Sequence, residues 1–260
     1  MHLARRFVNE IQQSSLAART KSQKLVLIKT LIKSGIQYGL VSENPFVNMQ
    51  LKAPKGTTHN TYRSFTRDEL RKIYQLVHSK GDIERCWVLD ALICTGSRQG
   101  EITYLRKEDI KRTHKGTWFV DFKHQPLHQH PMTLKGGVAG ERRMPWHPLL
   151  LQEKYQDYVQ QKADGYIVRC SKDSSVWSVW FRDQILKRLG IYSKGDTGLH
   201  SLRNTAIDLW REAGIDQEHR RAFVAHASKD VQDKVYGEGL RNMADVMNKE
   251  LLKLDLSWLL

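Results

Sequence analysis

The sequence predicts an α+β protein, mainly α with a small antiparallel β-sheet. Apolar residues recur at helical spacing along most of the 260 residues. Between residues 118 and 146 this pattern gives way to short apolar runs separated by a glycine-rich reversal, which is typical of strands. A stretch rich in Pro, Gly, Thr and Lys from 51 to 64 divides a short first part from a long second part. A chain of this length can bury a core in the longer part.

A single helix dominates the first part. Residues 22–38 place four apolar side chains on one face: Leu25, Ile28, Ile32 and Ile36. Ser22 is a possible N-cap, and Gly39 follows the expected end. We therefore expect a small helical domain over residues 1–55.

The composition of residues 51–64, between the two parts, predicts an extended basic linker. Its composition disfavours both helix and strand, and residues 56–64 form its second half. We expect the larger domain to cover residues 65–260, including a helix in its C-terminal tail.

The larger domain begins with a helix that carries a clear start signal. Thr66 and Glu69 have the spacing of a capping box. The stripe that follows is expected to be buried core: Leu70, Ile73, Tyr74 and Val77. Residues 83–94 are apolar nearly all round, which predicts a central buried helix ended by Gly96, and Ser97 can cap the next helix.

Three runs predict the sheet. They are WFVDF at 118–122, HPMTL before Lys135 and RRMPW after it, and GGVAG allows the chain to reverse between the last two. Helical spacing then resumes over three further ranges: 149–162, 176–189 and 200–213.

Charge and composition narrow the class of protein. The net charge is +14 with a pI near 9.7, which favours a polyanionic partner, with nucleic acid as the first expectation. Residues 1–60 are disproportionately basic, with nine Lys or Arg against Glu10 and Glu43. The chain has no C-x-x-C pair, no secretory signal and no apolar stretch long enough to span a bilayer, so we expect a cytoplasmic protein with reduced cysteines.

One series of residues carries the chemistry of a metal-free phosphodiester-cutting site. Two guanidiniums, a lysine and two imidazoles suit the negative charge on a transferring phosphoryl group, and a phenol can be the nucleophile. The six residues are Arg98, Lys135, His200, Arg203, His226 and Tyr236.

Local spacing supports parts of this series. Arg98 would lie in the first turn of a helix, where backbone amides favour an anion, and Glu101 could hold its guanidinium. His200 and Arg203 are three apart and project from one side of a helical turn, so both can reach one phosphate. Taken alone, each pair is more often a solvated surface pair than a site.

The segments that carry the series resemble those of the tyrosine recombinases, the phage-integrase family. They are TGSRQGE at 95–101, TLKGGVAGERRMP at 133–145, LHSLRNT at 199–205 and VAHASKDVQDKVY at 224–236. The resemblance covers roughly residues 64–240, and residues 1–50 look like the later part of the family's helical core-DNA-binding domain. One departure is visible, since relatives usually read L-G-H where this chain has Val224, Ala225 and His226.

The resemblance implies a site-specific DNA recombinase that cleaves and rejoins DNA through a 3′-phosphotyrosyl intermediate, without metal or cofactor. Tyr236 would attack the scissile phosphate, and Lys135 would protonate the leaving 5′ oxygen. The remaining residues would neutralise or orient the phosphate: Arg98, Arg203, His200 and His226. Glu101 would support the site from behind.

The same resemblance implies double-stranded DNA as partner and a tetramer assembled on it. We expect four further basic residues to bind DNA: Lys52, Lys55, Arg142 and Arg143. The apolar tail after Tyr236 would then dock into a neighbouring protomer, although packing against its own domain is the alternative. Three properties do not follow from the sequence. They are the genetic element that encodes the chain (a phage, a genomic island or a chromosome), the DNA target sequence and the direction of the reaction.

Other functions remain open. A catalytically inactive DNA-binding accessory protein of the same fold would share all the folding signals, and a basic RNA-binding or structural protein would share the charge. The imidazoles of His124, His128 and His130 could bind zinc, but no cysteine or carboxylate is spaced to complete the set. Glycine signatures for nucleotide phosphates are absent from the sequence.

Overall fold

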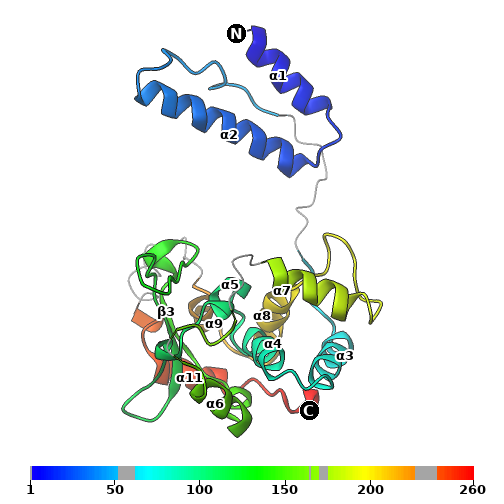
Figure 1. Ribbon diagram of the computed structural model, residues 1–260, viewed down its shortest axis with the longest axis vertical. Coiled ribbons are helices and arrows are strands. Elements are labelled where there is room, and N and C mark those ends of the chain that lie inside the picture. Colours follow the sequence, from blue (N-terminus) through cyan, green and yellow to red (C-terminus); the bar gives the residue numbers. More distant parts are fainter. Residues whose placement is uncertain (1, 52–61, 164, 170–174, 226–238) are drawn as a thin grey trace. The chain divides into compact units, whose positions relative to one another are not determined.

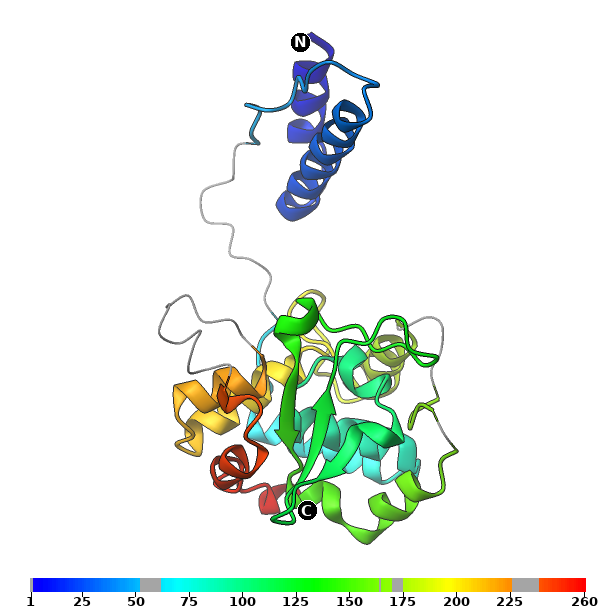
Figure 2. The same cartoon turned by 90° about the vertical axis from the view of Figure 1, so that its left-hand side faces the viewer.

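The computed structural model describes residues 2–51, 62–163, 165–169, 175–225 and 239–260. The chain divides into two compact units, Met1–His59 and Asn60–Leu260. Figures 1 and 2 show both units, with the chain coloured from its N-terminus to its C-terminus.

The first unit consists of two helices and the chain that follows them. Helix α1 spans His2–Gln13 and α2 spans Ala18–Gln37. Their small core contains Ala4, Leu25 and Phe46. Helix α2 begins four residues before the predicted Ser22, without a side-chain cap, so the predicted start was wrong.

The second unit contains the other helices. The α-helices among the described residues are α3 (Arg67–His78), α4 (Ile83–Thr95), α5 (Gln99–Thr103), α6 (Glu153–Gln160), α7 (Ser175–Trp180), α8 (Ser201–Glu212), α9 (Gln217–Phe223) and α11 (Ala244–Leu251). Short 3₁₀ segments are η1 (Lys107–Asp109), η2 (Gly137–Gly140), η3 (Pro148–Leu151) and η5 (Ser257–Leu259), and η4 (Phe181–Leu186) is π-helical. The predicted helix over 176–189 is therefore two segments of different winding.

Helices α3 and α4 form as predicted. The hydroxyl of Thr66 accepts a hydrogen bond from the amide of Glu69, whose carboxylate accepts one from the amide of Thr66. Helix α4 is buried from Cys86 to Thr95 and packs against α3 and α8. It ends at Gly96, which has a φ of +55°.

The sheet has three antiparallel strands in the order β1-β2-β3. They are β1 (Ile110–Arg112), β2 (Trp118–Phe122) and β3 (Arg142–Pro145), with Val120 paired to Ile110 on one side and to Met144 on the other. The predicted strand over 130–134 was wrong: this run makes only an isolated bridge between Met132 and Gln125. The strand that sequence patterning missed is β1, which has three residues, two of them exposed and basic. The fold class is as predicted, mainly helical with a small antiparallel sheet.

The tail packs against its own unit. Helix α11 packs against β3 and α9 (Figure 1). Met247 and Leu251 have no exposed surface, and Leu254, Leu256 and Leu259 are also buried. In the described structure these five side chains are covered in cis, so docking into a neighbour is not needed to bury them, while Met243 and Val246 remain exposed.

Candidate active site

The site is built around the turn between α4 and α5. Gly96 allows this turn because its φ lies in the left-handed region and because a Cβ there would come within 2.6 Å of the Trp210 ring. Ser97 is buried, and Arg98 is the N-cap residue of α5. The predicted N-cap at Ser97 was therefore one residue too early. Arg98 itself is the N-cap, immediately before the first turn of α5.

Glu101 holds this turn in place. Its carboxylate accepts hydrogen bonds from the backbone amide of Arg98 at 3.0 Å and from the Arg98 guanidinium at 2.8 Å. Arg142 of β3 donates at 2.8 Å to Oε2 of this carboxylate, the oxygen that also accepts from the Arg98 amide. Burial raises the pKa of Glu101, but the charge and hydrogen bonds of Arg142, followed by those of Arg98, outweigh it and lower the pKa to about 2.

Two buried arginines connect this turn to the end of α9. Arg142 donates to the Ser97 hydroxyl at 3.0 Å and to the Phe223 carbonyl at 2.7 Å. Arg203 of α8 donates to the Gly96 carbonyl at 2.6 Å and to the Val224 carbonyl at 3.1 Å. The α4–α5 turn and the residues leading to His226 are therefore fixed relative to each other by paired guanidiniums.

Positive charge accumulates here beyond what the carboxylate of Glu101 neutralises. Arg203 is only 4% exposed, and burial together with the charge of Arg98 lowers its pKa to about 10. The pKa of His200 is lowered by desolvation and then by Arg203, Arg98 and Lys135. The neighbouring cations thus lie close enough to disfavour the charged forms of His200 and Arg203. An anion that enters the site would reduce this repulsion.

His200 and Lys135 reach this region from separate segments. His200 is the N-cap residue of α8, and its exposed imidazole lies 5.9 Å from the ring of Tyr62, centroid to centroid. Lys135 is exposed in the connection between β2 and β3. The base of this connection is fastened by the imidazole of His124, which accepts from the Leu134 amide at 3.1 Å.

Two predicted site residues, His226 and Tyr236, lie outside the described residues, as do Lys52 and Lys55. The described chain stops at Ala225, which has a φ of +51°. This is the left-handed region that favours glycine. Ala225 therefore adopts a glycine-like conformation at the position where the sequence departs from the L-G-H pattern.

Arg142 has a different position from the one expected of a DNA contact. Its side chain has no exposed surface, and its guanidinium donates to protein groups and lies 4.2 Å from the centre of the Phe122 ring. Direct contact with DNA would require it to leave these partners. Successive strand residues point to opposite faces, and Arg143 is the one that is exposed, at 43% of its side chain.

Metal-ligating side chains gather elsewhere. Among the described residues, one group of three, Asp216, His219 and Glu250, lies close enough to share an ion, and Glu250 already pairs with Lys253. The imidazoles of the predicted alternative do not form such a group: His128 pairs with Glu108, and His124 binds the Leu134 amide.

Comparisons with known proteins bear on the fold. No family model and no curated protein sequence matches the chain. Solved structures match over most of its length. A fragment of lambda integrase, crystallised as a dimer on a core site, has a TM-score of 0.60 at 18% identity, covering 86% of this chain and 78% of that one. The chain has the fold of the tyrosine recombinases.

Two other structures carry the same fold. The Tn1549 transposon integrase, in complex with transposon right-end DNA, has a TM-score of 0.58 at 16% identity, covering 92% of this chain and 84% of that one. The XerH recombinase, bound to its difH substrate, has a TM-score of 0.57 at 13% identity, covering 97% and 66%. None of the helices in the described part of the chain is long and apolar enough to cross a membrane.

Proposed function

We propose that this chain is a site-specific DNA recombinase that cleaves and rejoins DNA through Tyr236. The observation that supports it best is the convergence of Arg98, His200 and Arg203 from α5 and α8, where burial and then the charge of neighbouring cations lower the pKa of both His200 and Arg203. A phosphodiester placed against these groups would supply the missing negative charge. The chain's fold is found in integrases and recombinases that were crystallised on DNA.

In the proposed first step, the phenol oxygen of Tyr236 attacks the scissile phosphorus. The bond from phosphorus to the 5′ oxygen breaks, so the 3′ phosphate becomes linked to the tyrosine and the other strand end becomes a free 5′ hydroxyl. Because one phosphodiester replaces another, the reverse attack by a 5′ hydroxyl from a second strand reseals DNA without an external energy source.

Proton transfers complete the balance of this step. The departing 5′ oxygen needs a proton, which we assign to the Lys135 ammonium, and the attacking phenol must lose one. His200 is suited to handle protons near neutral pH because desolvation and the neighbouring cations favour its neutral form. His226 would assist from the segment that follows Ala225.

The arginines would stabilise the negative charge on the phosphate during the proposed reaction. Arg98 retains 26% exposure of its side chain and is held by Glu101, so it can meet a phosphate without first being ordered. Arg203 would add its buried charge from α8. Arg142 is assigned to positioning, because it holds both the carboxylate of Glu101 and the Phe223 carbonyl.

DNA binding and assembly are part of the same proposal. The basic residues Lys52, Lys55 and Arg143 would contact the DNA backbone, and the net charge of +14 would give binding a strong dependence on salt. We propose that protomers assemble on DNA, as a tetramer in the complete recombination complex.

Covalent trapping tests the proposal. DNA that the protein binds is first selected from a random-sequence pool, and nicked versions are then prepared so that a short 5′-hydroxyl fragment can diffuse away after cleavage. We expect a protein–DNA adduct that survives denaturation. After nuclease digestion, mass spectrometry should find the residual nucleotide on Tyr236. An adduct on another residue, or DNA binding with no cleavage of any selected site, would contradict the proposal.

A further inference from the structure

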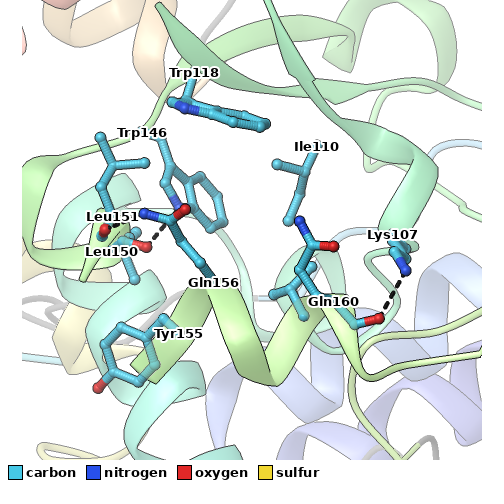
Figure 3. Close-up of a pocket in the computed structure, with 10 residues that line it drawn as sticks. Lys107, Ile110, Trp118, Trp146, Leu150, Leu151, Tyr155, Gln156 and Gln160 are labelled. Carbon is cyan, nitrogen blue, oxygen red and sulfur yellow. Dashed lines mark hydrogen bonds between the residues drawn. The ribbon is translucent and has the colours of Figure 1, made fainter. Parts of the chain in front are cut away.

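A pocket of about 230 Å³ lies between the sheet and helix α6, and the proposed DNA chemistry does not use it. Figure 3 shows Trp118 above it, Trp146 and Leu150 on one side and Ile110 on the other. Helix α6 forms the opposite wall with Val159 and two glutamines. A partly enclosed pocket with one wall of aromatic and aliphatic side chains and an opposite wall that combines Val159 with two amides is suited to a small ring system.

The two indoles offer ring surface to the pocket. The indole N–H of Trp146 donates to the Leu150 carbonyl at 3.1 Å, so its polar edge is already satisfied. Its backbone amide donates to the Trp118 carbonyl at 2.8 Å, which ties the two tryptophans together. The Arg112 guanidinium lies 5.6 Å from the centre of the Trp118 ring. A flat aromatic group can therefore stack in the pocket without leaving the indole N–H of Trp146 unpaired.

The rim of the pocket carries a positive charge. The Lys107 ammonium donates to the backbone carbonyls of Gln160 at 2.9 Å and Lys162 at 3.4 Å. Within the described part of the chain, no carboxylate lies within ion-pair distance of it. An ammonium has three N–H donors and carbonyls are neutral, so one donor and the whole charge remain for a ligand.

We propose that this pocket binds a small aromatic carboxylate. The ring would lie between Trp118, Trp146 and Val159, and the carboxylate would pair with Lys107 at the rim. The pocket volume limits the occupant to a small molecule of one or two rings. Binding at this site is independent of the tyrosine chemistry, although β3 connects the two places: Arg142 begins the strand and Trp146 follows it.

Calorimetric titration of the full chain with two matched probes tests this inference. The probes are 2-naphthoate and its uncharged analogue 2-naphthamide. We expect the wild type to bind the carboxylate at least fivefold more tightly than the amide. Lys107→Gln should abolish this preference while leaving amide binding unchanged. Lys115→Gln, which removes an exposed charge from the β1–β2 turn, should keep it.

A blocking variant tests the location. Val159→Trp fills the pocket from its half-buried wall and should weaken both probes at least tenfold, with circular dichroism confirming that the variant is folded. Should it not fold, the comparison of Lys107→Gln with Lys115→Gln decides alone. The proposal is overturned if neither probe binds the wild type, if both bind equally, or if Lys107→Gln retains the preference. Equal loss of preference in Lys115→Gln would overturn it too, because that result indicates attraction by diffuse charge.

Discussion

Glu101 is the residue on which the geometry of the candidate site depends. It is 3% exposed and is bound by both Arg98 and Arg142, which come from different parts of the sequence. A buried carboxylate between two guanidiniums is favourable only when every partner is in place. The orientation of the Arg98 side chain therefore depends on Glu101 and on the strand that carries Arg142.

The lowered pKa of Glu101 predicts an acid-sensitive contribution to stability. The folded pKa of about 2 lies below the ordinary value of 4.5. The contribution is thus fully present above pH 4.5 and is lost as the pH falls toward 2. Its size is on the order of 3 kcal/mol. Urea unfolding between pH 7 and pH 3 should show a steeper loss for the wild type than for Glu101→Gln. The exposed Glu153→Gln should follow the wild type, and parallel curves for all three would refute this prediction.

Ala225 gives a second prediction at this scale. A left-handed conformation costs alanine about 1 kcal/mol or more relative to glycine, while glycine loses more entropy on folding. We expect Ala225→Gly to leave the free energy of unfolding unchanged or to raise it by up to ~1 kcal/mol. The control is Ala222→Gly in α9, where the backbone is helical and the change should cost about 1 kcal/mol. Equal destabilisation by both changes would show that Ala225 carries no strain.

Much of the site at residue scale could be predicted from the sequence, and part of it could not. Residue types and helical spacing predicted the pairs Arg98–Glu101 and His200–Arg203, and their assignment to one site came from the resemblance to the tyrosine recombinases. The structure brings these four residues together. The bonds from Arg142 and Arg203 to the carbonyls of Phe223 and Val224 could not be predicted, because they join segments distant in sequence. The alternation of side chains along a strand was the available signal that Arg142 and Arg143 face opposite ways.

At the scale of elements, strong local signals predicted the elements well. The capping box of α3 and the apolar run of α4 are such signals, and both helices begin or end where they indicate. Local signals did not predict all the short strands correctly. Strand β1 is three residues long and is held by pairing with β2, whereas residues 130–134 resemble a strand but have only one bridge partner. Pairing partners, which no local pattern shows, decide such cases.

Helix α11 carries the prediction for this scale. Leu251 has no exposed surface, whereas its neighbour Leu252 is 54% exposed. Leu251→Ala should therefore lower the free energy of unfolding by about 2–5 kcal/mol, and Leu252→Ala should lower it by less than ~1 kcal/mol. Both are measured by urea unfolding at two protein concentrations. Because the tail packs in cis, the midpoints should not depend on concentration. A dependence on concentration, or no effect of Leu251→Ala, would indicate that the tail helix belongs in a partner.

At the scale of the whole molecule, the sequence divides into a small basic helical unit and a larger unit with a recombinase fold. The basic balance of the chain and the arginine-rich site both suit a phosphodiester, although they arise at different scales. In the proposed reaction, charge would attract DNA of any sequence, while the geometry around Glu101 would select one phosphate for attack. The proposed reaction needs both, and it needs the phenol of Tyr236.

The most direct test compares covalent adducts formed by wild type, Tyr236→Phe and Tyr192→Phe on the same nicked DNA. Tyr192 is a half-buried tyrosine in the loop before α8 and serves as the matched control. Denaturing gels should show the adduct for the wild type and for Tyr192→Phe and none for Tyr236→Phe. All three proteins should bind the DNA with nearly equal affinity in a native gel, because affinity comes from lysine and arginine contacts. An adduct that persists in Tyr236→Phe would contradict the assignment of Tyr236 as the nucleophile.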